Sequence, residues 1–366
     1  MNRHYQVVRT VTPQDSTATV DLHEFRLTST NTAIFTTYSP RLHEGIWTLD
    51  SSFQEIDLDS NRAVFTWNAL DHVPLSTSHV PRGNYLEVGD GLHHSSSWDY
   101  FHLNSVDKSK DGNYLISARH IDSVYALSSR DGSILWQLGG ENSTFILENF
   151  TYSRQHHARY VGESATQTII SLFDNDGDGY TATGTESKGL IVAIDHKNKS
   201  ARVAKQFNFP TPGGHVSPSM GNVEQLQEGN VLVNWGAQSR MAEYSQDGNP
   251  IWSADLGLLS RNYRAFKSDW IGQPLQLPAL FAAYDATNLS THVYMSWNGA
   301  TEVSSWRVYT SNTEIGPFSL IRETPKNGFE TVFSDEGLLL WVLVEAMDML
   351  GIDIYDASFH TCYAAN

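Results

Sequence analysis

Short runs of alternating apolar and polar residues recur along the chain, and turn residues separate them. Residues 102–138 and 221–256 show this pattern most clearly. In each, an alternating strand leads to a Gly-Asn turn, two apolar strands follow, and an Asp-Gly turn precedes a last strand that carries a tryptophan. The spacing between the two turns is nearly the same in both copies. Each segment therefore predicts a unit of four antiparallel strands.

Weaker copies of this unit precede, separate and follow the two clear ones. Residues 23–70 and 156–207 form two of them, and residues 293–309 look like a fifth copy. The tail, 328–361, can supply a sixth, closed by a strand around residues 5–11. Repetition of a four-stranded unit about six times is typical of a propeller. We therefore predict an all-β fold, a six-bladed β-propeller with four-stranded antiparallel blades around a central channel.

Two loop-rich stretches interrupt the repeats, and we interpret them as insertions and not as linkers between domains. Residues 73–99 and 257–290 are rich in Pro, Gly and Ser. In a propeller such insertions project from one face and frame the pocket. We therefore expect a single domain over 1–366 that carries both insertions. Residues 338–350 stay ambiguous, because a buried strand and a helix share their apolar composition.

Composition and charge exclude several classes of partner. The formal net charge of −17 argues against nucleic acid, because phosphate binding needs a basic face. No apolar run approaches the ~20 residues of a membrane-spanning helix. The single cysteine, Cys362, excludes a disulfide framework and a multi-cysteine metal site. The oligomeric state is left open.

Four N-x-S/T sequons bear on localisation, and they favour secretion mildly. We expect a glycosylated protein that is secreted or in the secretory pathway, with its signal peptide removed. The sequons lie at Asn142, Asn149, Asn198 and Asn288.

Histidines occupy the same position in three of the repeats. His23, His102 and His156 each lie at the first strand of a unit, and these strands line the channel of a propeller. Arg119 ends the second strand of the His102 unit, which also lies near the axis. We predict that these four residues form the catalytic centre. The substrate-binding residues expected beside them are Asn104, Gln155, Arg159 and Asn175.

Such a ring has a clear chemical use. Imidazole and guanidinium groups in an acidic protein create a local anion site. Histidine can also transfer protons or act as a nucleophile near neutral pH. The alternative is structural, because a histidine on an inner strand can be a satisfied core residue, and the repetition can be a relic of duplication.

The residues around this ring resemble the arylsulfotransferase-like proteins of fungi. The similarity lies in HLNSV at 102–106, the segment that ends in Arg119-His120, and Gln155-His156. It extends over nearly the whole chain, through WNALDHVPL, DYFHLNSVD, WQLGG, SLFDN and SWNGATEVSSWRVY. In bacterial members, the histidine that matches His156 accepts the sulfuryl group covalently, and the other positions bind the sulfate ester.

The resemblance also implies a second chemistry. Some fungal relatives are hetero-Diels–Alderases that join a tropolone-derived quinone methide to a humulene-type sesquiterpene. Cationic donors would hold a tropolonate oxygen, and cycloaddition needs two partners held in register away from water. Loop aromatics could shape the apolar half of the pocket, although each also suits blade packing: Trp98, Tyr100, Phe266 and Trp270.

Three functions remain open at this point. The favoured one is a pericyclase of fungal secondary metabolism, with small aromatic or tropolone and terpene substrates. The second is an arylsulfate sulfotransferase that uses a channel histidine. The third is a propeller without catalytic activity that binds a ligand or protein on one face.

Metal and cofactor motifs are weak or missing. Asp174, Asp176 and Asp178, followed by Gly179, match the first half of an EF-hand loop, but an Asp-Gly turn is the favoured interpretation and calcium the weaker one. Adjacent histidines such as His156-His157 would point to opposite faces of a strand, which opposes a shared zinc. The sequence contains no nucleotide or dinucleotide fingerprint. We expect neither a resident metal nor a cofactor.

Overall fold

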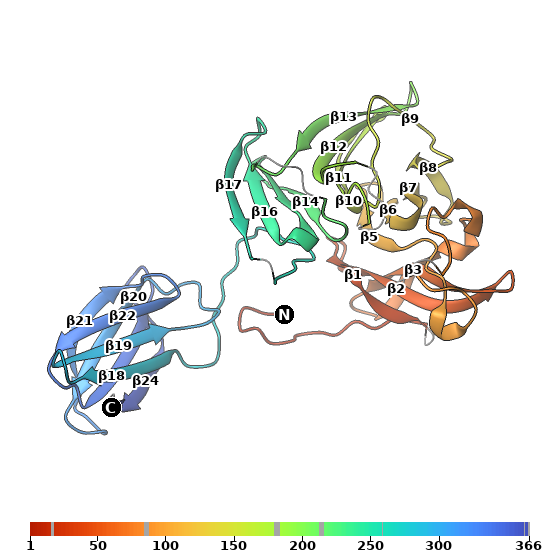
Figure 1. Cartoon of the computed structure of the whole chain (residues 1–366). Helices are drawn as coiled ribbons and strands as arrows, with labels where there is room; N and C mark the ends of the chain where they lie inside the picture. The colour runs from red at the N-terminus through yellow and green to blue at the C-terminus, as the bar shows by residue number, and fades with distance from the viewer. Residues whose placement is uncertain are drawn as a thin grey trace. The chain divides into compact units, whose positions relative to one another are not determined.

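The computed structural model describes residues 1–15, 18–83, 88–178, 184–211, 216–257, 259–361 and 363–364, with side chains as far as Ile354. The chain divides into two compact units (Figure 1). Val11–Lys267 form one, here called the blade unit. Met1–Thr10 and Ser268–Asn366 form the other, here called the tail unit. The repeat pattern predicts a single domain, so this division is a difference from the expectation.

The blade unit contains four sheets whose strands pair in chain order. Apart from one short parallel strand added to the third sheet, each sheet is antiparallel and corresponds to one of the four predicted repeats, which confirms those repeats. The first sheet contains β1 (Thr19–Leu27), β2 (Thr32–His43), β3 (Ile46–Asp57) and β4 (Arg62–Asn68). The second contains β5 (Leu103–Lys108), β6 (Tyr114–Ala118), β7 (Ser123–Leu127) and β8 (Ile134–Gly139).

The third and fourth sheets continue this pattern. The third contains β10 (His156–Glu163), β11 (Gln167–Asp174), β12 (Lys188–Asp195), β13 (Ser200–Phe207) and the short parallel strand β9 (Ile146–Leu147). The fourth contains β14 (Asn222–Gln225), β15 (Val231–Asn234), β16 (Arg240–Tyr244) and β17 (Pro250–Asp255). Short 3-10 helices lie between strands: η1 (Ala69–Asp71), η2 (Leu75–Thr77), η3 (His94–Ser96), η4 (Arg119–Ile121) and η5 (Gly236–Gln238).

The first strand of each sheet lies inside the blade unit. β5 packs against β1 and β10, and β14 packs against β10 and β11. In Figure 1, β13 and β17 lie on the outside of the unit, whereas β5, β10 and β14 lie near its middle. This arrangement is propeller-like, and it brings the strands that carry the predicted histidines together.

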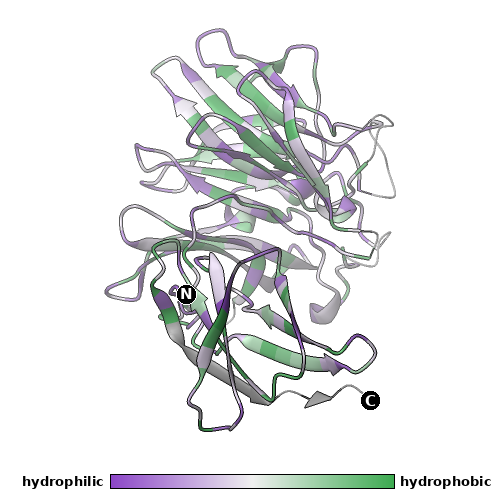
Figure 2. Ribbon diagram, turned by 90° about the vertical axis from the view of Figure 1, so that its left-hand side faces the viewer, coloured by the Kyte–Doolittle hydropathy of each residue, from purple (hydrophilic) through white to green (hydrophobic). Residues whose placement is uncertain are grey.

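Burial follows the order of strands within a sheet. Every residue of β6 and β7 is buried, whereas β17 is mostly exposed. Middle strands are covered on both faces by neighbouring sheets, so they are rich in apolar residues. Hydrophobic positions accordingly gather in the strands and hydrophilic ones in the loops (Figure 2).

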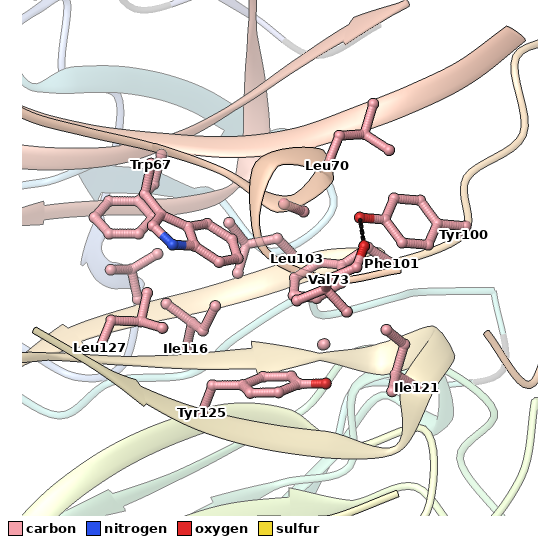
Figure 3. Close-up of a cluster of buried hydrophobic side chains, with 14 of the residues drawn as sticks. Trp67, Leu70, Val73, Tyr100, Phe101, Leu103, Ile116, Ile121, Tyr125 and Leu127 are labelled. Carbon is pink, nitrogen blue, oxygen red and sulfur yellow. Dashed lines mark hydrogen bonds between the residues drawn. The ribbon is translucent and has the colours of Figure 1, made fainter. Parts of the chain in front are cut away.

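An aromatic core joins the first two sheets (Figure 3). Trp67 and Phe101 are fully buried there, and their ring centroids lie 5.8 Å apart. Tyr100 is also fully buried, and its hydroxyl donates to the carbonyl of Val73 at 3.0 Å. The indole of Trp98 donates to the carbonyl of Val80 at 3.2 Å. The 73–99 insertion is therefore anchored in the core by its own backbone acceptors.

The tail unit is built differently. Its strands form two sheets in the orders β22-β19-β18-β25 and β21-β20-β23-β24, which interleave in sequence. One apolar cluster contains residues of both sheets, among them Val293 and Trp306, so the unit is a β-sandwich. Its strands are β18 (Ala279–Asp285), β19 (Ser290–Ser296), β20 (Ser305–Ser311), β21 (Ser319–Pro325), β22 (Glu330–Glu336), β23 (Trp341–Met347), β24 (Asp353–Thr361) and β25 (Tyr363–Ala364).

The fifth and sixth blades predicted from sequence are wrong. Residues 293–309 contribute to β19 and β20, which belong to different sheets. Residues 328–361 likewise divide between the two sheets, and residues 5–11 contain no described strand. Alternation predicts a strand but not its partner, so the tail resembles a blade in sequence only. The ambiguous segment 338–350 contains strand β23.

No helix in the described part of the chain is long and apolar enough to span a bilayer.

Candidate active site

The first strands of three sheets lose their regular pairing beside the predicted histidines. Register shifts occur between Val20 and Phe25 in β1, next to Leu103 in β5, and between His156 and Arg159 in β10. Such bulges redirect side chains. His102 and His157 also have positive φ angles of 55° and 57°. This conformation costs on the order of 1 kcal/mol for a non-glycine residue and concentrates at functional sites.

Three imidazoles meet at the inner ends of the first two sheets. The ring centroids of His23 and His102 lie 4.7 Å apart, and those of His102 and His120 lie 4.5 Å apart. The ring of Tyr263 lies 5.7 Å from His23 and 6.5 Å from His156. These five residues form what we call the histidine cluster, and it includes all three predicted histidines.

Two carboxylates, the buried Asp99 and the half-buried Asp21, orient the histidines of the first two sheets. Asp21 contacts Nδ1 of His23 at 2.6 Å, and Asp99 contacts Nδ1 of His102 at 2.5 Å. Burial alone would raise the pKa of Asp99, but the charge and hydrogen bond of His102 hold it at about 2. Burial lowers the pKa of His102, against the effect of Asp99. Nε2 of both histidines is left for a ligand, since their side chains remain 15% and 21% exposed.

His156 is held by hydrogen bonds on both ring nitrogens. Its Nδ1 lies 2.6 Å from Oδ1 of Asn175 and 3.1 Å from the carbonyl of Arg154, so Nδ1 carries the proton. The amide of Met220 donates to Nε2 at 3.3 Å. Burial and the nearby Arg119 charge lower the pKa of His156 well below its usual value. The ring is therefore a neutral imidazole with its lone pair on Nε2.

Arg119 supplies the positive charge of the site. It opens η4, and this turn also carries His120, whose Nε2 accepts from Nη1 of Arg119 at 2.8 Å. Its Nη2 donates to the carbonyl of Pro218 at 3.0 Å. Because Nδ1 of His120 lies 2.6 Å from the carbonyl of Asp99, it bears the proton of that ring. The guanidinium is thereby fixed between the second sheet and the loop before β14.

Two unpaired polar atoms make this region a candidate binding site. Nε of Arg119 and the hydroxyl of Tyr263 are both buried and have no hydrogen-bond partner among the described residues. An unpaired buried donor costs free energy, so it indicates a missing ligand group. Both donors would suit an anionic oxygen. The arrangement thus offers a nucleophile, oriented proton carriers and anion donors in one place.

The same residues do not suit a metal ion well. One ligand atom each from Asp99, His102 and His120 lies within 4.8 Å of the other two. However, Nε2 of His120 already faces the Arg119 guanidinium, which would repel a cation. In the EF-hand-like segment, Lys188 lies 3.2 Å from Asp174 and Arg154 lies 3.2 Å from Asp178. The segment from Gly179 to 183 lies outside the described residues.

Comparison with known proteins adds a family. A family model described as arylsulfotransferase (ASST) matches residues 1–257, which is most of the chain and nearly all of the blade unit. The chain belongs to the arylsulfotransferase family. No curated protein matches it.

Solved structures are only distantly similar to this chain. A protein of unknown function from Bacteroides caccae is 13% identical with a TM-score of 0.32, covering 82% of this chain and 80% of that one. The PQQ-bound aldose sugar dehydrogenase of Streptomyces coelicolor is 10% identical with a TM-score of 0.30, covering 72% and 84%. A GH43 protein of Bacillus licheniformis is 10% identical with a TM-score of 0.32, covering 92% and 75%.

The structure places the predicted substrate-binding residues in several environments. Asn175 lies in the site, where it orients His156. Nδ2 of Asn104 donates to the backbone carbonyl of Gln155 at 2.7 Å, and the Gln155 side chain bonds to the second sheet, so this pair joins two sheets. Arg159 pairs with Glu24 at 2.6 Å and lines a cavity that contains none of the histidine cluster.

The predicted aromatic wall is not assembled at this site. Trp98 and Tyr100 are buried in the core described above, where they pack the blade unit instead of facing a pocket. Phe266 lies beside His157 and lines a different cavity. Trp270 belongs to the tail unit, where its ring lies 6.0 Å from that of Tyr5. The large aromatic side chains predict a pocket wall, but Trp98 and Tyr100 are buried in the core instead.

Several members of the site are not predicted from the sequence. Asp21 lies two residues before His23, a spacing that places both on one face of a strand, so this pair could have been found. Asp99 lies three residues before His102 in a loop, where periodicity is uninformative. His120 follows Arg119 directly and shares its turn. Tyr263 comes from a non-repeating segment, and no sequence signal indicates it.

Proposed function

We propose that the protein transfers a sulfuryl group from an aryl sulfate to a phenolic acceptor, with His156 as the nucleophile. The observation that carries this proposal is the state of His156. Its Nδ1 proton is held by Asn175, its Nε2 lone pair is free of a proton, and burial keeps the ring neutral. A neutral, oriented imidazole beside a guanidinium is what attack on an anionic sulfate ester requires.

The first step forms one bond and breaks another. Nε2 of His156 attacks the sulfur, the N–S bond forms, and the bond between sulfur and the aryl oxygen breaks. The electron pair leaves with that oxygen as a phenolate. Arg119 and the Tyr263 hydroxyl donate to the sulfuryl oxygens, which is where their unpaired donors are of use. Met220 gives up its 3.3 Å contact to Nε2.

The second step returns the enzyme to its starting state. The oxygen of the acceptor phenol attacks the sulfur, and the N–S bond breaks, so His156 regains its lone pair. The acceptor's proton passes to Nε2 of His102, whose Nδ1 is held by Asp99, and from there to solvent, where it balances the phenolate released in the first step. His23, oriented in the same way by Asp21, hydrogen-bonds the phenolic oxygens.

One observation favours a second candidate, the hetero-Diels–Alder cyclisation implied by the sequence resemblance. His156 is only 2% exposed, whereas the side chains of His23 and His102 are 15% and 21% exposed. In this alternative, the two reachable histidines hold a tropolonate oxygen and assist loss of water, and His156 only supports the site. The substrates are then a hydroxymethyl tropolone and a humulene-type terpene alcohol.

The deciding experiment measures nitrophenol release from 4-nitrophenyl sulfate in the presence of phenol. We expect turnover by the wild-type protein and a loss of about 10³-fold or more in His156→Ala. Mass spectrometry of protein quenched at alkaline pH without acceptor should find the sulfuryl group on His156. His93→Asn, an exposed histidine of the same unit, is the matched control and should keep wild-type turnover.

Two outcomes would reject the transferase. One is the absence of release from folded wild-type protein, and the other is release that persists in His156→Ala. The next assay would then mix the hydroxymethyl tropolone with humulenol. Product formation that survives His156→Ala but falls in His102→Ala would support the cyclase.

A further inference from the structure

A cavity lies next to the histidine cluster within the blade unit. Its volume is ≈ 480 Å³, within the usual range for small-molecule sites. The inner strands β1, β5, β10 and β14 all contribute to its wall, together with the segment after β17. We call it the His157 cavity. The residues used below are His157, Arg26, Arg159, Arg264, Phe25 and Phe266.

His157 is the unexplained residue of this cavity. It is 2% exposed, and neither ring nitrogen makes a hydrogen bond of normal geometry with the described residues, although the Val223 backbone lies near enough to favour its protonated form. Its positive φ turns it away from the position of its neighbour His156. An imidazole with both nitrogens unpaired in a buried wall is costly unless a ligand completes it.

Three arginines line the same cavity as this ring: Arg26, Arg159 and Arg264. Burial is the main cause that lowers the pKa of His157, and the charges of Arg159 and Arg264 lower it further. Arg159 and Arg264 share the carboxylate of Glu24, at 2.6 and 3.0 Å.

The carboxylates of the cavity already have partners. Glu24 also accepts from the amide of Val106, and Asp107 pairs with Arg26 and the amide of Tyr160. Glu224 at the wall accepts from the backbone amide of Lys267. One donor is left over, because Nε of Arg264 is buried without a partner among the described residues. Arg264 and His157 line the same cavity, and an oxyanion there would supply the acceptor that both unpaired groups lack.

Two phenylalanine side chains also line the cavity. The Phe266 ring lies 5.6 Å from the His157 ring at an interplanar angle of 55°, and its side chain is still 57% exposed. Phe25 is 62% exposed on the same cavity. Exposed aromatic surface next to buried donors suits a ligand with a charged head and a flat body.

The His157 cavity is separate from the histidine cluster although the two share a backbone. His23, His156 and Tyr263 face the cluster, whereas the next residue in each case, Glu24, His157 or Arg264, lines the cavity. A ligand in the cavity therefore contacts none of the residues assigned above to sulfuryl transfer.

We propose that the His157 cavity binds a small aromatic carboxylate, with its oxyanion on His157 and Arg264 and its ring on Phe266. This site is independent of the proposed transfer reaction and stands or falls without it.

The test is titration calorimetry of the full-length protein with benzoate, and benzamide serves as the neutral analogue of the same shape. We expect saturable binding of one benzoate and at least about tenfold weaker binding of benzamide, because the charge-assisted bonds are lost. His157→Asn tolerates a positive φ and should weaken benzoate binding about tenfold or more. Phe266→Ala, at an exposed wall position, should weaken it severalfold. His93→Asn is the matched control.

Several results would overturn the proposal. These are no benzoate heat at millimolar concentration, equal affinity for benzamide, or unchanged binding in both His157→Asn and Phe266→Ala. Binding that disappears in His156→Ala but persists in His157→Asn would place benzoate in the histidine cluster instead. Thermal denaturation of each variant verifies folding, and Phe266→Ala supplies the answer if His157→Asn does not fold.

Discussion

His156 and His157 are adjacent, equally buried, and in opposite situations. Both are 2% exposed. His156 has a partner on each ring nitrogen, from Asn175 and Met220, whereas His157 has none of normal geometry among the described residues. A bulge in β10 directs the His156 side chain to the histidine cluster and the His157 side chain to the His157 cavity. Burial alone therefore does not identify the role of a histidine.

The difference lies in what each ring is ready to do. A ring with both nitrogens held is fixed in tautomer and orientation, which suits a catalytic nucleophile. A ring with both nitrogens vacant has lost its hydration without replacement, which suits recognition of a ligand. The following predictions test this contrast, from the largest expected effect to the smallest.

Removing the partner of His156 should slow turnover without much change in KM. Asn175→Ala deletes the acceptor that holds Nδ1, so the ring loses its orientation. Outer-shell partners of metal-binding histidines contribute about 10- to 100-fold to activity, and we expect a fall of similar size in kcat here. Asn249→Ala, in an exposed turn, is the control. An unchanged kcat in folded Asn175→Ala would show that His156 needs no positioning.

Acidification should destabilise the protein through its buried histidines. Burial holds the pKa of His120, His156 and His157 well below 6.5, so these rings stay neutral when folded and take up protons when unfolded. The stability they contribute is present above about pH 6.5 and is lost as pH falls, at up to ~1.4 kcal/mol per pH unit for each ring. Urea denaturation between about pH 7 and 5 measures this.

His157→Asn tests how much of this pH dependence of stability comes from the His157 ring. It should flatten the pH dependence by about one histidine's contribution, relative to wild type. The comparison with wild type matters because burial raises the pKa of Asp174 to about 6, which acts in the opposite direction. A variant that keeps the full slope would mean that His157 is not held neutral in the folded protein.

The unpaired hydroxyl of Tyr263 should be dispensable for folding. Tyr263→Phe removes a buried group without a partner among the described residues, so we expect the free energy of unfolding to stay level or rise by up to about 1 kcal/mol, while sulfuryl transfer slows. Tyr100→Phe is the matched control, because its buried hydroxyl donates to Val73 and its loss should cost about 1 kcal/mol. Equal destabilisation in both variants would contradict the assignment of Tyr263 to ligand binding.

The four blades could be predicted because their information is local. Each turn is marked by Gly-Asn or Asp-Gly, or by a break in alternation, and each strand pairs with its neighbour in sequence. The tail unit has the same alternation. However, β18 pairs with its neighbour β19 on one side and with β25, which is far away in the chain, on the other. Pairing at that distance leaves no mark in a strand's own sequence, so the prediction extended the blade count too far.

The histidine cluster was partly predictable for the same reason. Equivalent positions in successive blades converge, so the repeat pattern alone places His23, His102 and His156 together. The His157 cavity was not predictable. It depends on a bulge that turns His157 aside, and an unbroken strand would have placed that residue elsewhere. Arg264 and Phe266 come from a segment without any repeat.

The interleaved strands of the tail unit also constrain how the protein is made. Each blade can pair as soon as its own four strands have left the ribosome. The sandwich cannot close until β25 has been synthesised, because that strand pairs with β18. Met1–Thr10 belong to the same unit, where the carbonyl of Arg3 accepts from the amide of Gln273 at 2.8 Å. They therefore cannot meet this partner until all four blades have been synthesised, and a chain interrupted before β25 would hold complete blades and an incomplete sandwich.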